Sequence, residues 1–319
     1  MSELQTRDFV SELHQGKNLS AAMAAELDNT CSLNVDAVST HVKLIGFNLA
    51  RTPETLRSRF THIFWLIEHD PGNNCWPEIV LLSTNELCPS DLMDEARERW
   101  LKQVDLHPND ALTAAHAGLF LIERDPSAGE MLLNKAICLF PSNEDWPRQL
   151  ASYQFLETQR AKGPINLELA KKSLASGARF LKMYGKDGGR KQSPLREMAL
   201  GWCAQSALWS EEFILAREYA EEHLELIKDW TVLPKVSHSV LGLLALRSGD
   251  IVSAKRHLLI LKKQSLLTKL DLQLANELLA QGETSTVLRY LDRCQALGHW
   301  LPMIAQWKDE VTMGHKIGT

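Results

Sequence analysis

The chain has 319 residues, of which 35 are basic and 40 acidic, so its formal net charge is −5. So small an imbalance excludes nucleic acid and anionic membranes as the dominant partners. Hydrophobic residues make up 45% of the sequence and charged residues 24%, a balance that excludes general disorder. No stretch free of charged side chains approaches the roughly 20 apolar residues needed to cross a bilayer.

The N-terminus and the cysteines indicate a cytoplasmic protein. The first residues, MSELQTRDFVSELHQGK, mix both charge signs and lack the apolar segment of a secretory signal. The cysteines lie far apart without a C-x-x-C pair, which favours reduced thiols over a disulfide framework or a zinc site. They are Cys31, Cys75, Cys88, Cys138, Cys203 and Cys294. We expect no metal and no other cofactor.

The first part of the chain precedes any clear repeat. Residues 1–60 predict an irregular N-terminal helical cap and contain no convincing helix-turn-helix. Residues 93–108 then place Ala96 and Trp100 on one helical face before Pro108, as the second helix of a hairpin would. Alternating β-branched runs bounded by tight turns are missing from the sequence, so we expect no sheet.

The segment from Pro108 to Pro141 indicates one complete repeat of 33 residues. Small residues at Ala117, Gly129 and Ala136 alternate with large ones, because two closely crossing helices need small side chains at the crossing. Each proline is followed by Asn, Asp or Ser residues, whose side chains can cap the next helix. This pattern is close to that of tetratricopeptide repeats.

Two later segments repeat the pattern most clearly. In 241–261, Gly242 and Ala254 stand on either side of a Ser-Gly-Asp turn. In 274–294, Ala275 precedes a second glycine turn. Looser copies occupy the sequence before them, so at least five helical hairpins are expected.

Together these segments predict an all-α protein, folded as a right-handed α-solenoid of stacked tetratricopeptide-like helical hairpins. The predicted division has three parts. They are an N-terminal cap over 1–60, repeats over 61–294, and a C-terminal capping helix and tail over 295–319.

Several stretches are particular enough to suggest a family. They are FTHIFWLIEHDP (60–71), WLKQVDLHPND (100–110), GEMLLNKAICLFPSNEDWPRQLA (129–151), VLGLLALRSGDIVSAKRHLL (240–259), LANELLAQGETSTVLRYLDRC (274–294) and WKDEVTMGHKI (307–317). In these stretches the chain resembles a group of bacterial tetratricopeptide-type proteins without an assigned activity. The resemblance implies the helical-repeat fold and leaves the function open.

Recognised catalytic and metal-binding spacings are missing from the sequence. Glu68, His69 and Asp70 are adjacent on a helix and cannot converge on one ion. His62 and His69 share a helix face but lie two turns apart, too far to hold one zinc ion unaided. We expect His116 to be a hydrogen-bonded histidine between helices.

A basic loop is one candidate binding site. Residues 182–196 carry a local charge of +4, from five cations and one aspartate. Their first expected role is to neutralise the acidic residues of 211–225. The alternative is an anion docking site for an acidic tail or a phosphorylated segment, with Lys186, Arg190 and Lys191 as its cations.

The second candidate is the concave wall that the first helices of stacked hairpins would form. Side chains just after each small packing residue, and one turn further on, should project into this groove. An aromatic pair, amides and a guanidinium suit a peptide backbone, although the apolar members could instead belong to the core. The predicted partner-binding residues are Ser152, Phe155, Trp202, Gln205, Arg247 and Asn276, with Leu243 and Leu279 at equivalent positions.

The sequence favours a non-catalytic scaffold that binds a peptide or partner protein in this groove. Two alternatives stay open. One is a regulator whose solenoid closes on a small peptide; the other is a hydrolase whose acidic and histidine side chains converge from several repeats. Neither nucleic acid nor a membrane is an expected partner, and the oligomeric state is left open.

Overall fold

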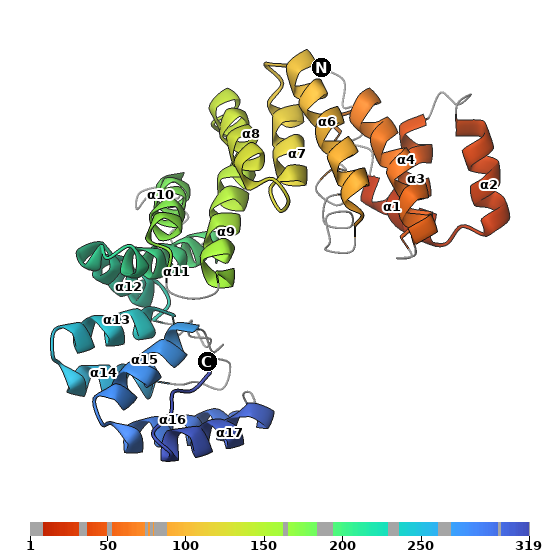
Figure 1. The fold of residues 1–319 in the computed structure, drawn as a ribbon. Helices are drawn as coiled ribbons and strands as arrows, with labels where there is room; N and C mark the ends of the chain where they lie inside the picture. Colours follow the sequence, from red (N-terminus) through yellow and green to blue (C-terminus); the bar gives the residue numbers. More distant parts are fainter. Residues whose placement is uncertain are drawn as a thin grey trace. The chain divides into compact units, whose positions relative to one another are not determined.

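The computed structural model is helical wherever regular structure is described. The described residues are 9–31, 37–49, 53–73, 76, 79, 88–161, 165–183, 194–228, 236–260, 269–298 and 301–318. This part of the chain holds sixteen helices and no strand (Figure 1), which confirms the predicted all-α class. No helix in it is long and apolar enough to cross a membrane.

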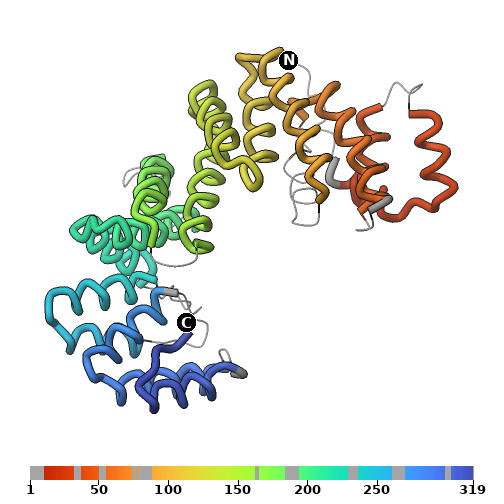
Figure 2. The backbone as a smooth tube through the Cα atoms, in the orientation of Figure 1, coloured from red at the N-terminus to blue at the C-terminus, as the bar shows by residue number. Residues whose placement is uncertain are grey.

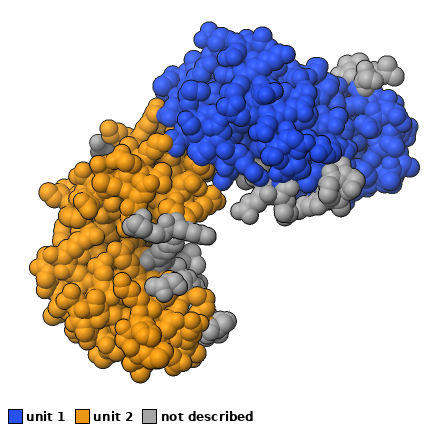
Figure 3. All heavy atoms as spheres, viewed as in Figure 1, with its two compact units in different colours: residues 1–146 blue, residues 147–319 orange. Residues whose placement is uncertain are grey.

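The chain divides into two compact units, residues 1–146 and 147–319 (Figure 3). The helices of unit 1 are α1 (Phe9–Lys17), α2 (Ala21–Thr30), α3 (Ala37–Phe47), α4 (Pro53–His69), α6 (Ser90–Leu106), α7 (Ala111–Leu121) and α8 (Pro126–Leu139). At the boundary begins α9 (Asp145–Arg160). Unit 2 continues with α10 (Leu167–Met183), α11 (Pro194–Trp209), α12 (Phe213–Leu226), α13 (Val236–Arg247), α14 (Ile251–Leu258), α15 (Lys269–Ala280), α16 (Thr284–Ala296) and α17 (Leu301–Thr312). The three-part division at 1–60, 61–294 and 295–319 stays a prediction.

In unit 1, helices from α3 to α8 pack each against the next, and α1 and α2 both pack against α3. Aromatic side chains fill the centre of this unit. Trp76 and Trp100 meet edge to face with ring centroids 4.7 Å apart, and Phe120 lies 6.2 Å from Trp100. All three side chains are fully buried, so they supply a large share of the apolar area in this core.

The predicted repeat between Pro108 and Pro141 is the hairpin of α7 and α8. A Cβ atom added to Gly129 would lie 2.5 Å from the Cα of Ile122, so the two backbones touch where the helices cross. Ala117 and Ala136 are fully buried beside this crossing. The small residues are therefore required by the helix separation, as the sequence pattern predicts.

Unit 2 is a stack of hairpins in two layers. The first helices touch in succession, since α11 contacts α13 and α13 contacts α15. Each first helix also contacts its own second helix, in the pairs α11 with α12, α13 with α14, and α15 with α16. Figure 2 shows the backbone reversing its direction between the two helices of a pair, as from α13 to α14. This is the stacking that the repeat pattern predicts.

Close contact also joins successive hairpins of unit 2. A Cβ atom added to Gly242 would lie 2.5 Å from a methyl carbon of Leu274 on the next first helix. Ala254 and Ala275 are fully buried. These contacts confirm the predicted hairpin at 274–294 and, over its described residues 241–260, the one at 241–261.

Side-chain caps begin the helices where the sequence places them. The carboxylate of Asp110 accepts hydrogen bonds from the backbone N–H groups of Leu112 and Thr113 at the start of α7. Asn143 caps the start of α9 in the same way, through the N–H groups of Asp145 and Trp146. These bonds satisfy donors that a helix leaves unpaired.

The N-terminal helices contain a crossing that the repeat pattern did not reveal. A Cβ atom on Gly16 would lie 2.0 Å from the carbonyl oxygen of Lys43, and one on Gly46 would lie 2.1 Å from that of Leu13. Paired glycines thus bring α1 and α3 into backbone contact. Their spacing follows no repeat period, so the sequence predicted only an irregular cap here.

Replacing Gly129 by alanine should lower the free energy of unfolding by about 2 kcal/mol, because the new methyl group would overlap the backbone of α7. Urea unfolding followed by circular dichroism measures the change. Gly72→Ala is the control, since the nearest described atom to a Cβ there, on Asp110, would be 3.6 Å away. Equal stability of G129A and the unmodified chain would contradict the need for backbone contact.

Candidate peptide-binding surface

One side of α15 faces the core of unit 2 and the other side carries a depression. The core side consists of Leu270, Leu274, Ala275 and Leu278, all fully buried. The other side lines a shallow depression of about 490 Å³. Its lining residues are Leu272, Gln273, Asn276, Glu277 and Ala280 from α15, with Lys316, Ile317 and Gly318 from the C-terminal segment.

The C-terminal segment reaches this depression because of how α17 ends. Gly314 adopts a φ of 79°, which is accessible to glycine at little cost and ends the helix. The N–H of His315 then donates to the carbonyl of Glu310 at 2.7 Å, closing the turn. The chain is thereby directed back to α15, so that Ile317 and Gly318 lie against this helix, which Figure 1 labels.

Asn276 binds the backbone of this segment with both ends of its side-chain amide. Its Nδ2 donates to the carbonyl oxygen of Ile317 at 2.9 Å, and its Oδ1 accepts from the N–H of Ile317 at 2.8 Å. The two bonded residues are 41 positions apart in the chain. The backbone that Asn276 binds belongs to the same chain, and its role in binding a partner stays a prediction.

Apolar contacts complete the seat of the C-terminal segment. Ile317 is only 1% exposed. Gly318 has a φ of 67°, and a Cβ atom there would lie 2.8 Å from a methyl carbon of Leu272. The surface thus combines an amide that hydrogen-bonds a peptide backbone with an apolar recess that holds one side chain. Grooves that bind extended peptides use these two elements.

The predicted aromatic pair comes together at a second place in unit 2. Phe155 on α9 stacks on Trp202 on α11, with ring centroids 5.6 Å apart and planes inclined by 28°. Both side chains are half-buried, and so is Ser152 one turn earlier on α9. Each ring pair of this kind leaves apolar area at the surface, where a ligand side chain could pack.

Other predicted residues lie in different surroundings. Gln205 is only 2% exposed, and its Nε2 has no hydrogen-bond partner among the described residues. Leu243 is fully buried, so at this position the core alternative applies, whereas Leu279 is half-buried. Arg247 is exposed at the end of α13, where its guanidinium lies 4.6 Å from the centre of the Phe213 ring. Their role in binding stays a prediction.

The predicted anion docking residues Lys186, Arg190 and Lys191 lie outside the described residues. Arg196, at the end of the same basic stretch, forms an ion pair with Glu222 of α12. This contact joins the basic stretch to the acidic helix, as the neutralising role would require.

Hairpins of two antiparallel helices repeat about every 33 residues, and their first helices contact one another in succession. This arrangement is typical of tetratricopeptide repeats. The fold is tetratricopeptide-like. The resemblance seen in the sequence is thus confirmed at the level of the fold.

Comparison with known proteins adds similar structures but no close relative. No protein-family model and no curated protein matches this tetratricopeptide-like chain. Similar solved structures include PilW, a widely conserved type IV pilus biogenesis factor (14% identity, 70% of this chain, 92% of that one, TM-score 0.41). Others are PilF of Pseudomonas aeruginosa (13%, 76%, 98%, 0.43) and a tetratricopeptide repeat protein of Parabacteroides merdae (10%, 85%, 98%, 0.45).

A buried serine, histidine and carboxylate meet in unit 2 of the tetratricopeptide-like stack. Nδ1 of His223 lies 2.7 Å from the hydroxyl of Ser237, and its Nε2 lies 3.0 Å from a carboxylate oxygen of Glu197. These distances match a hydrolytic triad. Ser237 and His223 are fully buried, however, so no substrate carbonyl can approach the hydroxyl. The three residues bond successive helices and do not form an open active site.

A second polar cluster lies in unit 1. His41 contacts the Cys31 sulfur through Nε2 at 3.1 Å and Nδ1 of His62 through its own Nδ1 at 3.0 Å. Nε2 of His62 in turn faces Asp28 at 3.9 Å. Burial first, and the charges of neighbouring histidines second, lower the pKa of His41 to about 3; burial also lowers the pKa of His62. Neutral imidazoles with one N–H each can satisfy this chain of contacts.

The remaining sequence candidates have separate partners. His116 is buried between helices and its ring Nδ1 lies 2.9 Å from the carbonyl of Pro71, as predicted for a hydrogen-bonded histidine. Glu68 pairs with Arg99, whereas His69 bonds the carbonyl of Trp65. No group of three or more potential ligands that could hold a metal ion occurs in the described ranges.

The sequence identified several of these polar residues but not the residues that they contact. Nothing local marks Ile317 as the residue that binds Asn276. The link between Cys31 and His41 spans a stretch without repeat period. One missed signal was available, namely Arg289 and Arg293 at a spacing of four on an exposed helix face.

Stability should fall as the pH falls below the ordinary histidine pKa of 6.5. Because the folded-state pKa values of His41 and His62 are lowered, the unfolded chain binds more protons in this range, at up to about 1.4 kcal/mol per pH unit for each histidine. Urea unfolding at pH 7.5 and pH 5.0 measures this slope.

The double variant H41Q/H62Q should be less stable at pH 7.5 but should depend less on pH. His14→Gln is the control, because His14 is exposed on α1. If H41Q/H62Q and H14Q keep the same slope, other groups cause the acid destabilisation.

Proposed function

We propose that the chain is a non-catalytic protein-interaction module, in which the exposed faces of first helices in unit 2 hold an extended segment of a partner protein. The observation that carries this proposal is the pair of hydrogen bonds between Asn276 and the backbone of Ile317. To form this pair of bonds, a peptide needs one residue whose backbone N–H and C=O are both available, whatever the side chain of that residue. It therefore fits any extended peptide whose apolar side chain enters the recess.

The aromatic pair of Phe155 and Trp202 extends the proposal to a second contact point. Half-buried stacked rings offer apolar area at a low cost in side-chain entropy. Ser152, Gln205 and Arg247 complete the proposed contact residues. For Gln205, contact with a ligand requires its buried amide to turn outward.

A specific observation also favours the regulatory alternative. The chain's own C-terminal segment occupies the seat on α15, so a partner peptide must displace it. Binding is then reduced by the free energy that holds the segment, and whatever releases the segment increases the affinity for the partner. Under this alternative the segment acts as a competitor built into the chain.

The proposal is of a cytoplasmic protein whose partners are proteins or peptides, with no role for a cofactor. The three-part division, with repeats over 61–294 between two capping regions, is proposed with it. The loop cations Lys186, Arg190 and Lys191 are proposed as an additional contact for an acidic partner segment.

Binding can be measured with a fluorescein-labelled peptide of the last seven residues, MGHKIGT. Ile317→Asp should release the intramolecular segment, because a carboxylate would replace a buried side chain. The I317D variant should therefore bind the peptide at least about ten-fold more tightly than the unmodified chain, as seen by fluorescence anisotropy.

The N276A/I317D variant should lose this gain, because the backbone of the peptide no longer finds its amide. Asn134→Ala in the I317D background is the control, since Asn134 lies on α8 in unit 1, where its amide bonds the carbonyl of Glu130 one turn away. No gain in I317D, or full binding in N276A/I317D, would refute the proposed function.

A further inference from the structure

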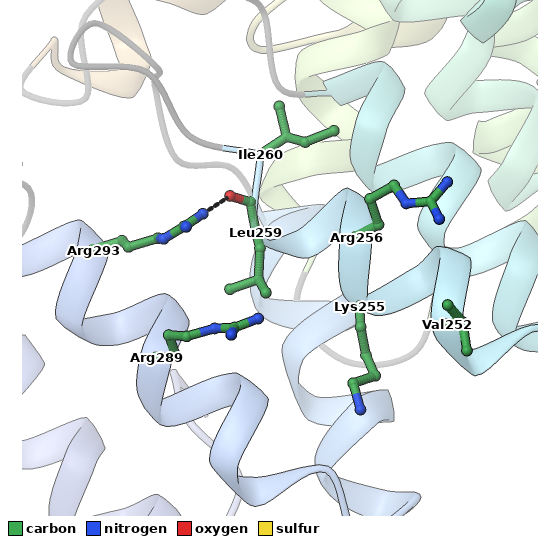
Figure 4. Close-up of a pocket in the computed structure, with 7 residues that line it drawn as sticks. All are labelled: Val252, Lys255, Arg256, Leu259, Ile260, Arg289 and Arg293. Carbon is green, nitrogen blue, oxygen red and sulfur yellow. Dashed lines mark hydrogen bonds between the residues drawn. The ribbon is translucent and has the colours of Figure 1, made fainter.

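A basic pocket lies between the second helices α14 and α16, away from the surface that carries Asn276. Its volume is about 430 Å³. Its lining consists of four cationic and three apolar side chains (Figure 4). They are Lys255, Arg256, Arg289 and Arg293, with Val252, Leu259 and Ile260.

The positive charge of this pocket is only partly balanced within the chain. Lys255 pairs with Glu283 at 2.7 Å, and Arg293 donates to the carbonyl oxygen of Leu259. Among the described residues, Arg256 and Arg289 have no hydrogen bond or ion pair. The carboxylate of Asp292 on α16 is already held by Lys308 at 2.6 Å.

The cations are placed to act together on one ligand. Arg289 and Arg293 are one turn apart on α16, and Figure 4 shows both side chains extending from this helix towards Leu259 on the facing segment. Arg289 is exposed and retains its full set of N–H donors. A guanidinium binds the two oxygens of a carboxylate with matching geometry, which an ammonium group cannot do.

We propose that this pocket binds an acidic segment of a partner protein. A carboxylate of the segment pairs with Arg289, a second acidic group lies near Arg256 or Lys255, and a neighbouring apolar side chain packs on Leu259 and Ile260. Charge complementarity supports this occupant, and the apolar wall favours a peptide over a bare inorganic anion, which would leave most of the volume unfilled.

This site is independent of the proposed function on α15. It is lined by residues of the second helices α14 and α16 and of the segment after α14, whereas Asn276 is on the first helix α15, and the two sites share no lining residue. A nucleic acid is a less favourable occupant, because the chain carries a net charge of −5 and phosphate binding along a strand needs an extended basic surface.

The test uses the full chain and three labelled probes at low ionic strength. They are the acidic peptide Glu-Asp-Leu-Glu-Asp-Leu, its amide counterpart Gln-Asn-Leu-Gln-Asn-Leu, and a single-stranded oligonucleotide of twelve thymidines. Fluorescence anisotropy should detect the acidic peptide alone, with an affinity that falls as salt is raised.

Arg289→Glu should weaken binding of the acidic peptide at least about ten-fold, because it reverses the unpaired charge in the pocket. Arg217→Glu is the matched control, since Arg217 is an exposed arginine on the second helix α12 and does not line the pocket. Circular dichroism checks that both variants keep their helix content.

Three results would overturn the proposal. They are equal binding of the acidic and amide peptides, equal losses in R289E and R217E, and tighter binding of the oligonucleotide than of the acidic peptide. Because R289E changes no residue of the α15 surface, binding of the MGHKIGT probe to the I317D variant with and without R289E still reports on that surface. Failure of one site is therefore distinguishable from failure of the other.

Discussion

Direct contact between helix backbones is the constraint on which the rest of this structure depends. At Gly129 and Gly16 a methyl group would overlap the backbone of the neighbouring segment, and at Gly242 it would overlap the side chain of Leu274. A hairpin of two short helices cannot bury its own apolar face, so it gains stability only by stacking on the next pair. Contact this close fixes the rotation of each helix, and that rotation decides which side chains remain for binding.

The fold was predictable from the sequence because these contacts leave a periodic trace. Gly242 and Ala275 are 33 residues apart and both lie at helix crossings. The same register predicted that Asn276 would face a peptide, but it gave Leu243 the equivalent place one repeat earlier, where the side chain is buried. Segments that are distant in the sequence decide which face of a helix is covered. The repeat period gives no information about where such segments pack. The return of Ile317 to α15 is such a case.

Buried polar pairs give the stack of unit 2 a defined register. Ser173 meets Ser206 at 2.8 Å between α10 and α11, and Ser239 donates to the fully buried Asp271 between α13 and α15. His223 bonds residues of both α11 and α13. Sliding one hairpin along the next would leave these groups unpaired in an apolar setting, which costs more than the loss of packing alone. The triad-like geometry is thus explained by helix alignment.

The two proposed binding surfaces share the α15–α16 hairpin, yet they need not communicate. Asn276 is on α15 and Arg289 on α16, which are joined by a turn at Gly282. For a ligand on one helix to affect the other, the hairpin would have to shift against α13. The side chain of Leu274 packs directly against Gly242, and Ser239 donates a hydrogen bond to Asp271, so such a shift would disturb both contacts. Coupling between sites requires a second packing arrangement of similar energy, and these contacts oppose one. A partner that engaged both surfaces would therefore gain affinity by linking two independent contacts, through the higher effective concentration of its second segment.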